Sequence, residues 1–411
     1  MGRGPIDCVF PRWTLAGRSL LPVVQGGMGV GISAHRLAGT VASHDAMGTI
    51  ASIDLRHHHP DLMEKTRRCR DKTQLDRVNL VALDREVRAA LAIADGRGIV
   101  AVNVMRAVTD HSAYVRQACM SGAQAIVMGA GLPLDLPDLV VDFPKVALIP
   151  ILSDARGVAI VIKKWMRKGR LPDAVVIEHP RYAGGHLGAT RLEEVDDARF
   201  DFSTVLPTVR ALLTELGIEP ERIPLIPAGG INGPDQISRL LALGASAVQL
   251  GTPFAVTEEG DAHPNFKKVL AEARPEDIVT FMSVAGFPAR AVLTPWLRTY
   301  LKREERLKAV AKADRARCAI ALDCLEHCGL RDGNAKAGQF CIDAQLSAAL
   351  AGDVQRGLFF RGAASLPFAA AIRPVRALLQ YLLTPGAMYA RREPLRLPAS
   401  RPMILVPGGS S

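Results

Sequence analysis

Eight short apolar runs, separated by stretches with helical periodicity, constrain the fold of this chain more than any other feature. Each run is apolar throughout, as expected of a strand that is buried on both faces of a sheet. Strands of this kind that alternate with helices indicate parallel βαβ units, and eight such units predict a (β/α)8 TIM barrel. The runs are residues 20–28, 47–52, 98–105, 125–131, 146–153, 174–179, 224–231 and 247–254.

The stretches between the runs predict helices with recognisable ends. We expect Ser33 to cap the first of them and Pro234 to stand in the first turn of another, because these residue types favour those positions. A doubly wound sheet is the alternative architecture, but it does not require eight strands, and its glycine fingerprint opens a helix after the first strand. The clearest helical patterns are residues 33–44, 83–96, 203–217 and 234–244.

The 411 residues are enough for one large α/β domain with an extension. We expect residues 1–275 to form the barrel and residues 276–390 to form a mainly helical extension on the substrate side. Residues 391–411 are rich in proline and predict an irregular tail. A charged insertion, residues 54–74, follows the second apolar run.

Composition restricts the kinds of partner. The formal charge of +10 suits anionic ligands such as phosphates, carboxylates or acyl carriers, and a small anionic substrate such as a nitronate or an acyl thioester. Nucleic acid is disfavoured as a partner because the basic residues are dispersed and no aromatic-basic stripe appears. We expect no membrane partner either, since no run of about 18 apolar residues occurs. Seven cysteines and the lack of an apolar leader predict a cytoplasmic protein, which could be a homo-oligomer.

Glycine-rich loops follow several of the apolar runs, where the active site of a barrel gathers. Residues 25–31 contain four glycines, whereas a tight turn needs only one or two, so backbone amides could approach a flat ligand there. Asn103 follows the third run and could hydrogen-bond a ligand edge, or it could order its own loop. The loops after the seventh and eighth runs predict a phosphate site, with plain barrel packing as the alternative. Their candidate residues are Gly229, Gly230, Gly251 and Thr252.

The loop after the sixth run has the sequence EHPRYAGGHLG, residues 178–188. Gly184 and Gly185 could bring backbone to the same phosphate from the other side. His186 would then project over the ligand, where an imidazole with a near-neutral pKa could take a proton. A lone histidine is usually structural, but its position beside two glycines at a strand end favours a catalytic role.

The ordered set PVVQGGMGVGIS, VNVM, GAGLP, AGGHLG, IPAGGIN and VQLGTPF resembles the FMN-dependent nitronate monooxygenases, also called 2-nitropropane dioxygenases. The resemblance covers roughly residues 18–300. It implies that Gly27 and Met28 line the flavin ring, that Asn103 contacts FMN, and that His186 is the base that takes the α-proton of a nitroalkane. It also implies that residues 283–290 lie near the substrate pocket. The implied phosphate ligands are Gly184, Gly185, Gly229, Gly230, Gly251 and Thr252.

Two departures from the family pattern leave the substrate open. Residues 179–182, HPRY, replace a short acidic link, and residues 43–48 replace a glycine-rich turn. The same scaffold serves enoyl-acyl-carrier-protein reductases and quinone reductases. An NAD(P)H-dependent flavin reductase of enoyl thioesters or quinones is therefore the alternative function, with NAD(P)H as electron donor. A non-catalytic binder of a phosphate ligand is the third.

Two clusters could bind metal. Cys318, Cys324, Cys328 and Cys341 could hold zinc or an iron–sulfur cluster, but their spacing is not a standard one. They resemble a cysteine-bearing carboxyl-terminal segment of longer family members, to which residues 340–363 are also similar. Thiols packed in a small helical core are the favoured interpretation. The three histidines of residues 57–59 stand in a charged insertion, and we expect them to be solvated rather than metal ligands. No metal ligand is therefore assigned from the sequence.

Overall fold

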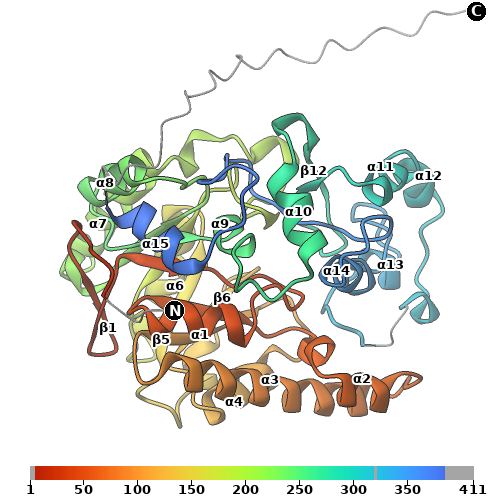
Figure 1. Cartoon of the computed structure of the whole chain (residues 1–411), viewed down its shortest axis with the longest axis horizontal. Coiled ribbons are helices and arrows are strands. Elements are labelled where there is room, and N and C mark those ends of the chain that lie inside the picture. Colours follow the sequence, from red (N-terminus) through yellow and green to blue (C-terminus); the bar gives the residue numbers. More distant parts are fainter. Residues whose placement is uncertain (1–4, 319–321, 385–411) are drawn as a thin grey trace, which may run out of the picture.

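A closed barrel of eight parallel strands forms the centre of the computed structural model, which describes residues 5–318 and 322–384 (Figure 1). The strands follow one another around the barrel in chain order, and the last pairs with the first. Every predicted apolar run contains one barrel strand, so the (β/α)8 prediction is confirmed. The strands are β3 (Val23–Gln25), β4 (Met47–Ala51), β5 (Ile99–Met105), β6 (Ala125–Gly129), β7 (Ala147–Leu152), β8 (Val175–Glu178), β10 (Leu225–Ala228) and β11 (Val248–Leu250).

Side chains on these strands alternate between two apolar cores. Val24 points into the barrel, where it joins a cluster with Met47 and Ile99, whereas the adjacent Val23 packs outward against the helices. Both cores are apolar, which explains why the runs carry no polar alternation. A hairpin of β1 (Trp13–Leu15) and β2 (Arg18–Leu20) belongs to the inner cluster and closes the amino-terminal end of the barrel. The opposite end, where the strands terminate, is left for a binding site.

The predicted helices are present, with one difference at a boundary. Helix α1 is capped by Ala34, and the Ser33 hydroxyl instead accepts a hydrogen bond from the Met28 amide, so the N-cap prediction was wrong. The α-helices are α1 (His35–Ser43), α2 (Pro60–Thr66), α3 (Lys72–Ala94), α4 (His111–Met120), α5 (Leu136–Leu139), α6 (Ala155–Met166), α7 (Phe202–Glu215), α8 (Pro234–Ala242), α9 (Thr252–Ala255), α10 (Pro264–Glu272), α11 (Pro295–Leu301), α12 (Glu304–Ala309), α13 (Gly329–Asp332), α14 (Ile342–Leu350) and α15 (Val375–Leu383). Short 3-10 helices are η1 (Leu55–His58), η2 (Leu192–Glu194), η3 (Ala198–Phe200), η4 (Pro220–Arg222), η5 (Pro275–Asp277) and η6 (Arg315–Arg317).

Helix α15 completes the outer ring of the barrel. Only the four-residue α9 follows β11 directly, too short to cover a strand. Helix α15 packs against α1, α8 and α9 and buries Leu378, Leu379 and Leu382 in the outer core (Figure 1). The chain therefore leaves the barrel after β11 and returns to it with α15. None of the described helices is long and apolar enough to span a membrane.

The region between α10 and α15 lies beside the carboxyl-terminal face of the barrel. Besides its helices, it contains two strands that the sequence analysis did not identify, β12 (Ile278–Met282) and β13 (Pro288–Val292). Together with the two-residue β9 (Gly185–His186) they form an antiparallel sheet. The domain boundaries at residues 275 and 390 stay predictions, and residues 391–411 lie outside the described part of the chain.

The charged insertion folds back onto the barrel, so the prediction of solvated histidines was wrong. His58 Nε2 lies 2.8 Å from the Gly31 carbonyl oxygen, and His59 Nε2 lies 3.0 Å from a Glu86 carboxylate oxygen. His57 Nε2 lies 3.3 Å from Asp54. The charge pattern of the insertion gave no sign that α3 and the β3–α1 loop offer these buried partners.

Candidate active site

A cavity of about 500 Å³ opens at the carboxyl ends of the barrel strands. Its walls contain every candidate site residue, although the loops that carry them are far apart in the sequence. The structure thus brings the predicted residues together, and their individual roles remain proposals. They are Gly27, Met28, Asn103, Gly184, Gly185, His186, Gly229, Gly230, Gly251 and Thr252.

At two of these positions only glycine fits. The glycine backbone there lies against the backbone or a side chain of another segment. A Cβ on Gly27 would lie 2.4 Å from the Cβ of Asn103. A Cβ on Gly184 would lie 2.5 Å from the backbone of Arg361 and Gly362. Both distances are far inside van der Waals contact, so any side chain would displace the wall. The result is a cavity whose surface at these loops is main chain, which leaves room for a flat ligand and exposes backbone amides.

A third loop, residues 361–365, joins the predicted phosphate cradle. The Gly362 amide donates a hydrogen bond to Thr252 Oγ1 at 3.0 Å, and Asn232 Nδ2 donates to Ser365 Oγ at 2.8 Å. The buried Arg361 fixes the loop by donating to the carbonyl oxygens of Leu270 and Gly362 at 2.9 and 2.7 Å. The sequence analysis missed this loop, and its only signal was a glycine directly after an arginine in RGAAS.

His186 lies on β9, opposite Ala289 of β13. Its Nε2 is 2.8 Å from Ser283 Oγ, and burial lowers the pKa of the imidazole to about 4. The ring is therefore neutral at physiological pH. When Nε2–H donates to Ser283, the lone pair of Nδ1 is left to accept a proton. Ser283 opens the segment 283–290 that the family resemblance placed near the substrate pocket.

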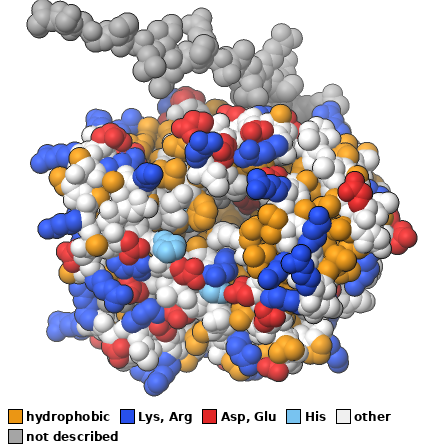
Figure 2. Space-filling model, turned by 180° about the vertical axis from the view of Figure 1, so that it is seen from behind, with side chains coloured by type: hydrophobic (Ala, Val, Ile, Leu, Met, Phe, Trp, Pro, Cys, Tyr) orange, Lys and Arg blue, Asp and Glu red, His pale blue; other side chains and the backbone are white. Residues whose placement is uncertain are grey.

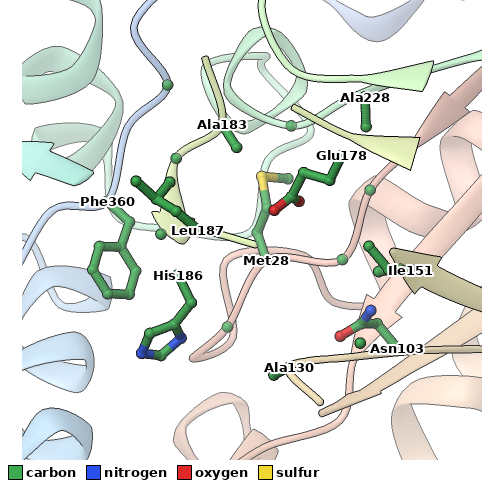
Figure 3. A pocket seen from close by; sticks show the side chains of 18 of the residues that line it. Met28, Asn103, Ala130, Ile151, Glu178, Ala183, His186, Leu187, Ala228 and Phe360 are labelled. Atoms are coloured by element: carbon green, nitrogen blue, oxygen red, sulfur yellow. The ribbon is translucent and has the colours of Figure 1, made fainter. Parts of the chain in front are cut away.

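Two polar side chains on the floor of the cavity have no hydrogen-bond partner among the described residues. They are Asn103, on β5, and Glu178, the last residue of β8 (Figure 3). Burial raises the pKa of the Glu178 carboxyl to about 7, and the charge of Arg290 opposes that shift. Glu178 was missed in the sequence, where its signal was a carboxylate that ends an otherwise apolar strand. Both side chains are available to a ligand.

The cysteines and the histidine insertion give no metal centre that we can assign. All seven cysteines are unbridged, and no three thiols lie within 4.8 Å of one another among the described residues. Ligand atoms of Asp54, His57 and Asp343 do approach that closely. There, however, Arg56 donates to both Asp54 oxygens at 2.6 and 2.9 Å and supplies the neighbouring positive charge. Packed thiols at the four carboxyl-terminal cysteines stay the prediction, with a metal or iron–sulfur cluster as the alternative.

Comparison with known sequences gives matches that carry the same family name. A family model described as nitronate monooxygenase matches residues 16–384. A protein named probable nitronate monooxygenase from Bacillus subtilis is 27% identical over 287 residues, which cover 67% of this chain and 77% of that protein. A nitronate monooxygenase from Pseudomonas aeruginosa is 35% identical over 120 residues, 29% of this chain and 31% of the relative.

Comparison with solved structures supports the fold. FabK from Thermotoga maritima superposes with a TM-score of 0.58 at 22% identity, covering 88% of this chain and 91% of that one. A nitroalkane oxidase from Streptomyces ansochromogenes gives a TM-score of 0.57 at 21% identity, with coverages of 88% and 94%. At these identities the likeness establishes the barrel architecture alone.

Proposed function

Because the chain belongs to the nitronate monooxygenase family and is an oxidoreductase of that type, we propose that it uses FMN to oxidise alkyl nitronates with molecular oxygen. A flavin is the cofactor of this family. The observation that carries the proposal is one cavity that combines a main-chain cradle with a buried, neutral histidine.

The lining of the cavity fits FMN. None of the described residues that line it is Lys or Arg, so a phosphate would be held by backbone amides. Gly184, Gly185, Gly229, Gly230 and Gly251 would supply these amides, with the Thr252 hydroxyl beside them. Gly27 and Met28 would lie against the flat ring. The unpartnered side chains of Asn103 and Glu178 would hydrogen-bond its polar edge.

The residues of the chain contribute orientation and proton transfer. Bound flavin supplies the electron acceptor for the nitronate and, once reduced, the site at which oxygen reacts. With a neutral nitroalkane, His186 takes the α-proton at Nδ1 and so generates the nitronate; with the nitronate itself, His186 contacts the substrate. Ser283 holds Nε2 and fixes the ring. The aromatic rings of Phe287 and Phe360, with centroids 6.2 and 5.7 Å from that of His186, keep bulk water from the imidazole.

We place the enzyme in the cytoplasm as part of this proposal, because its seven cysteines are all unbridged thiols. NAD(P)H-driven reduction of an enoyl thioester or quinone is the competing activity. Binding of a phosphate ligand without catalysis is the third.

The three functions differ in what reduces the flavin. We expect purified protein to be yellow and to release FMN, one per chain, on denaturation. Anaerobic stopped-flow mixing with an alkyl nitronate should bleach the flavin rapidly, whereas NADH and NADPH should leave it oxidised. Rapid bleaching by NAD(P)H alone would replace the proposal with the reductase. Protein that takes up no flavin would overturn both.

A further inference from the structure

The wall of the cavity beside His186 is apolar and lies outside the barrel strands for most of its extent. Seven of its residues belong to one hydrophobic cluster, so they are parts of a single packed region. Phe360, one of the seven, has its ring directly beside that of His186 (Figure 3). The seven residues are Met105, Cys324, Leu325, Ile342, Leu346, Leu358 and Phe360.

Charge is absent from the accessible surface of this wall. Asp343 lines the same side of the cavity, but both of its carboxylate oxygens are enclosed and have no hydrogen-bond partner among the described residues. No Lys or Arg lines any part of the cavity within residues 5–318 and 322–384. A substrate with a second anionic group near the wall would therefore bury that charge without a partner, which is strongly unfavourable. On the face seen in Figure 2, basic side chains are instead scattered over the outer surface among acidic ones.

We propose that the substrate carries a large, uncharged apolar group on its reacting carbon and that the wall formed by Met105 and residues 324–360 binds this group. The inference rests on the proposed function and narrows its substrate class to hydrophobic nitronates. It differs from the expectation drawn from net charge, because the excess of basic residues does not extend into the cavity.

The test is the dependence of kcat/KM on chain length. We measure kcat/KM for primary alkyl nitronates with three to eight carbons. The value for each is compared with that of a nitronate of the same chain length whose far end carries a carboxylate. Each methylene that the wall buries should raise kcat/KM about three- to fourfold, so hexyl should exceed propyl by at least about tenfold. The carboxylate compound should fall at least about tenfold below its uncharged counterpart. A flat series, or a preference for the carboxylate, would overturn the inference.

Variants at Leu346 locate the effect on the wall. Leu346→Ala should weaken the dependence on chain length, and Leu346→Arg should shift preference toward the carboxylate compound. Leu301→Ala is the matched control, because Leu301 packs on the same hydrophobic cluster without lining the cavity. Flavin content and thermal melting show whether each variant folds. If Leu346→Arg does not fold, the two alanine variants still decide the question, and equal chain-length dependence in both would overturn the role of the wall.

Binding without turnover separates this inference from the proposed function. Uncharged 1-nitroalkanes are titrated into the flavin-loaded His186→Asn variant, which lacks the proposed base, and the change in the flavin spectrum gives Kd. Tighter binding of longer chains supports the proposed role of the wall even if nitronates are not oxidised. In that case only the proposed function fails. A Kd that does not depend on chain length overturns the proposed role of the wall, even if nitronates are oxidised.

Discussion

The two sides of the cavity are built by different means. The barrel side presents main chain, because glycines lie in the loops that follow several of its strands, and a Cβ at Gly27 or Gly184 would collide with its neighbours. The side formed by residues 324–360 presents apolar side chains that belong to a hydrophobic cluster. His186 lies between the two, on a short strand that pairs with β13.

This difference suggests that the two sides of the cavity have different functions. Main-chain amides hold a phosphate in one geometry and tolerate little substitution. Side chains in a hydrophobic wall can be exchanged at modest cost, provided that volume is roughly conserved. We infer that the barrel side fixes the cofactor and the other side determines the substrate. Substitutions on the two sides should therefore affect different measured quantities.

The largest effect is expected where the two sides meet. His186→Asn should lower kcat/KM for a neutral nitroalkane about 10²- to 10⁴-fold, because proton abstraction loses its base. Flavin content should stay near one per chain, since the glycine loops are untouched. Steady-state oxygen consumption and absorbance measure the two quantities.

The control for this variant is His327→Asn, because His327 is exposed and does not line the cavity. It should match the unmodified enzyme in both measurements. Full turnover in His186→Asn would remove the catalytic role of the histidine. Loss of flavin from His186→Asn would show instead that His186 helps to bind the cofactor.

A smaller effect, confined to the cofactor, is expected from Gly27→Ala. The added Cβ would lie 2.4 Å from that of Asn103 and would push this side chain out of place. We expect the Kd for FMN to rise about tenfold or more, which corresponds to about 1.4 kcal/mol. Fluorescence quenching of FMN during titration of the apoprotein measures this change.

Gly39→Ala is the matched control for crowding. Its Cβ would lie 2.8 Å from the Ala90 carbonyl oxygen, in the contact between α1 and α3 and away from the cavity. It should lower the melting temperature and leave the Kd for FMN unchanged. An unchanged Kd in Gly27→Ala would show that the loop after β3 does not touch the cofactor.

The barrel side could be predicted from the sequence, whereas most of the other side could not. Buried parallel strands leave a local signal, eight apolar runs, and the fold then fixes where the residues after each run meet. Gly27, Asn103 and His186 therefore fall on one cavity as expected. Leu346 and Phe360 lie in a segment that resembles longer family members, but its position on the cavity depends on how the chain leaves the barrel and returns, which the sequence does not show.

Glu178 shows that some features of the site could not be predicted from the sequence even within the barrel. Its place at the end of an apolar strand was visible, but its lack of a partner was not. Whether a buried carboxyl is paired depends on the tertiary neighbours, and here Arg290 donates instead to the carbonyl oxygens of Pro180 and Ala183. The unusual pKa of Glu178 follows from that arrangement.

An effect confined to higher pH should come from Glu178→Gln. The folded-state pKa of Glu178 is about 7, above the ordinary value of 4.5, because burial disfavours the charged form. The folded protein thus holds this proton more tightly than the unfolded chain. The resulting stability is fully present below pH 4.5 and is lost as pH rises through 7.

Thermal melting of the apoprotein at pH 5 and pH 8 tests this sign. Glu178→Gln should melt close to the unmodified protein at pH 5 and above it at pH 8, by a free energy on the order of 1 to 3 kcal/mol. In the flavin-loaded protein, absorbance should show an inflection near pH 7 that the variant lacks, since we propose that the ionising carboxyl lies at the ring. Glu215→Gln, at an exposed position on α7, should change neither measurement. A pH-dependent flavin spectrum that survives in Glu178→Gln would move the titrating group elsewhere, and a stability difference without any spectral change would place Glu178 in the cavity but away from the cofactor.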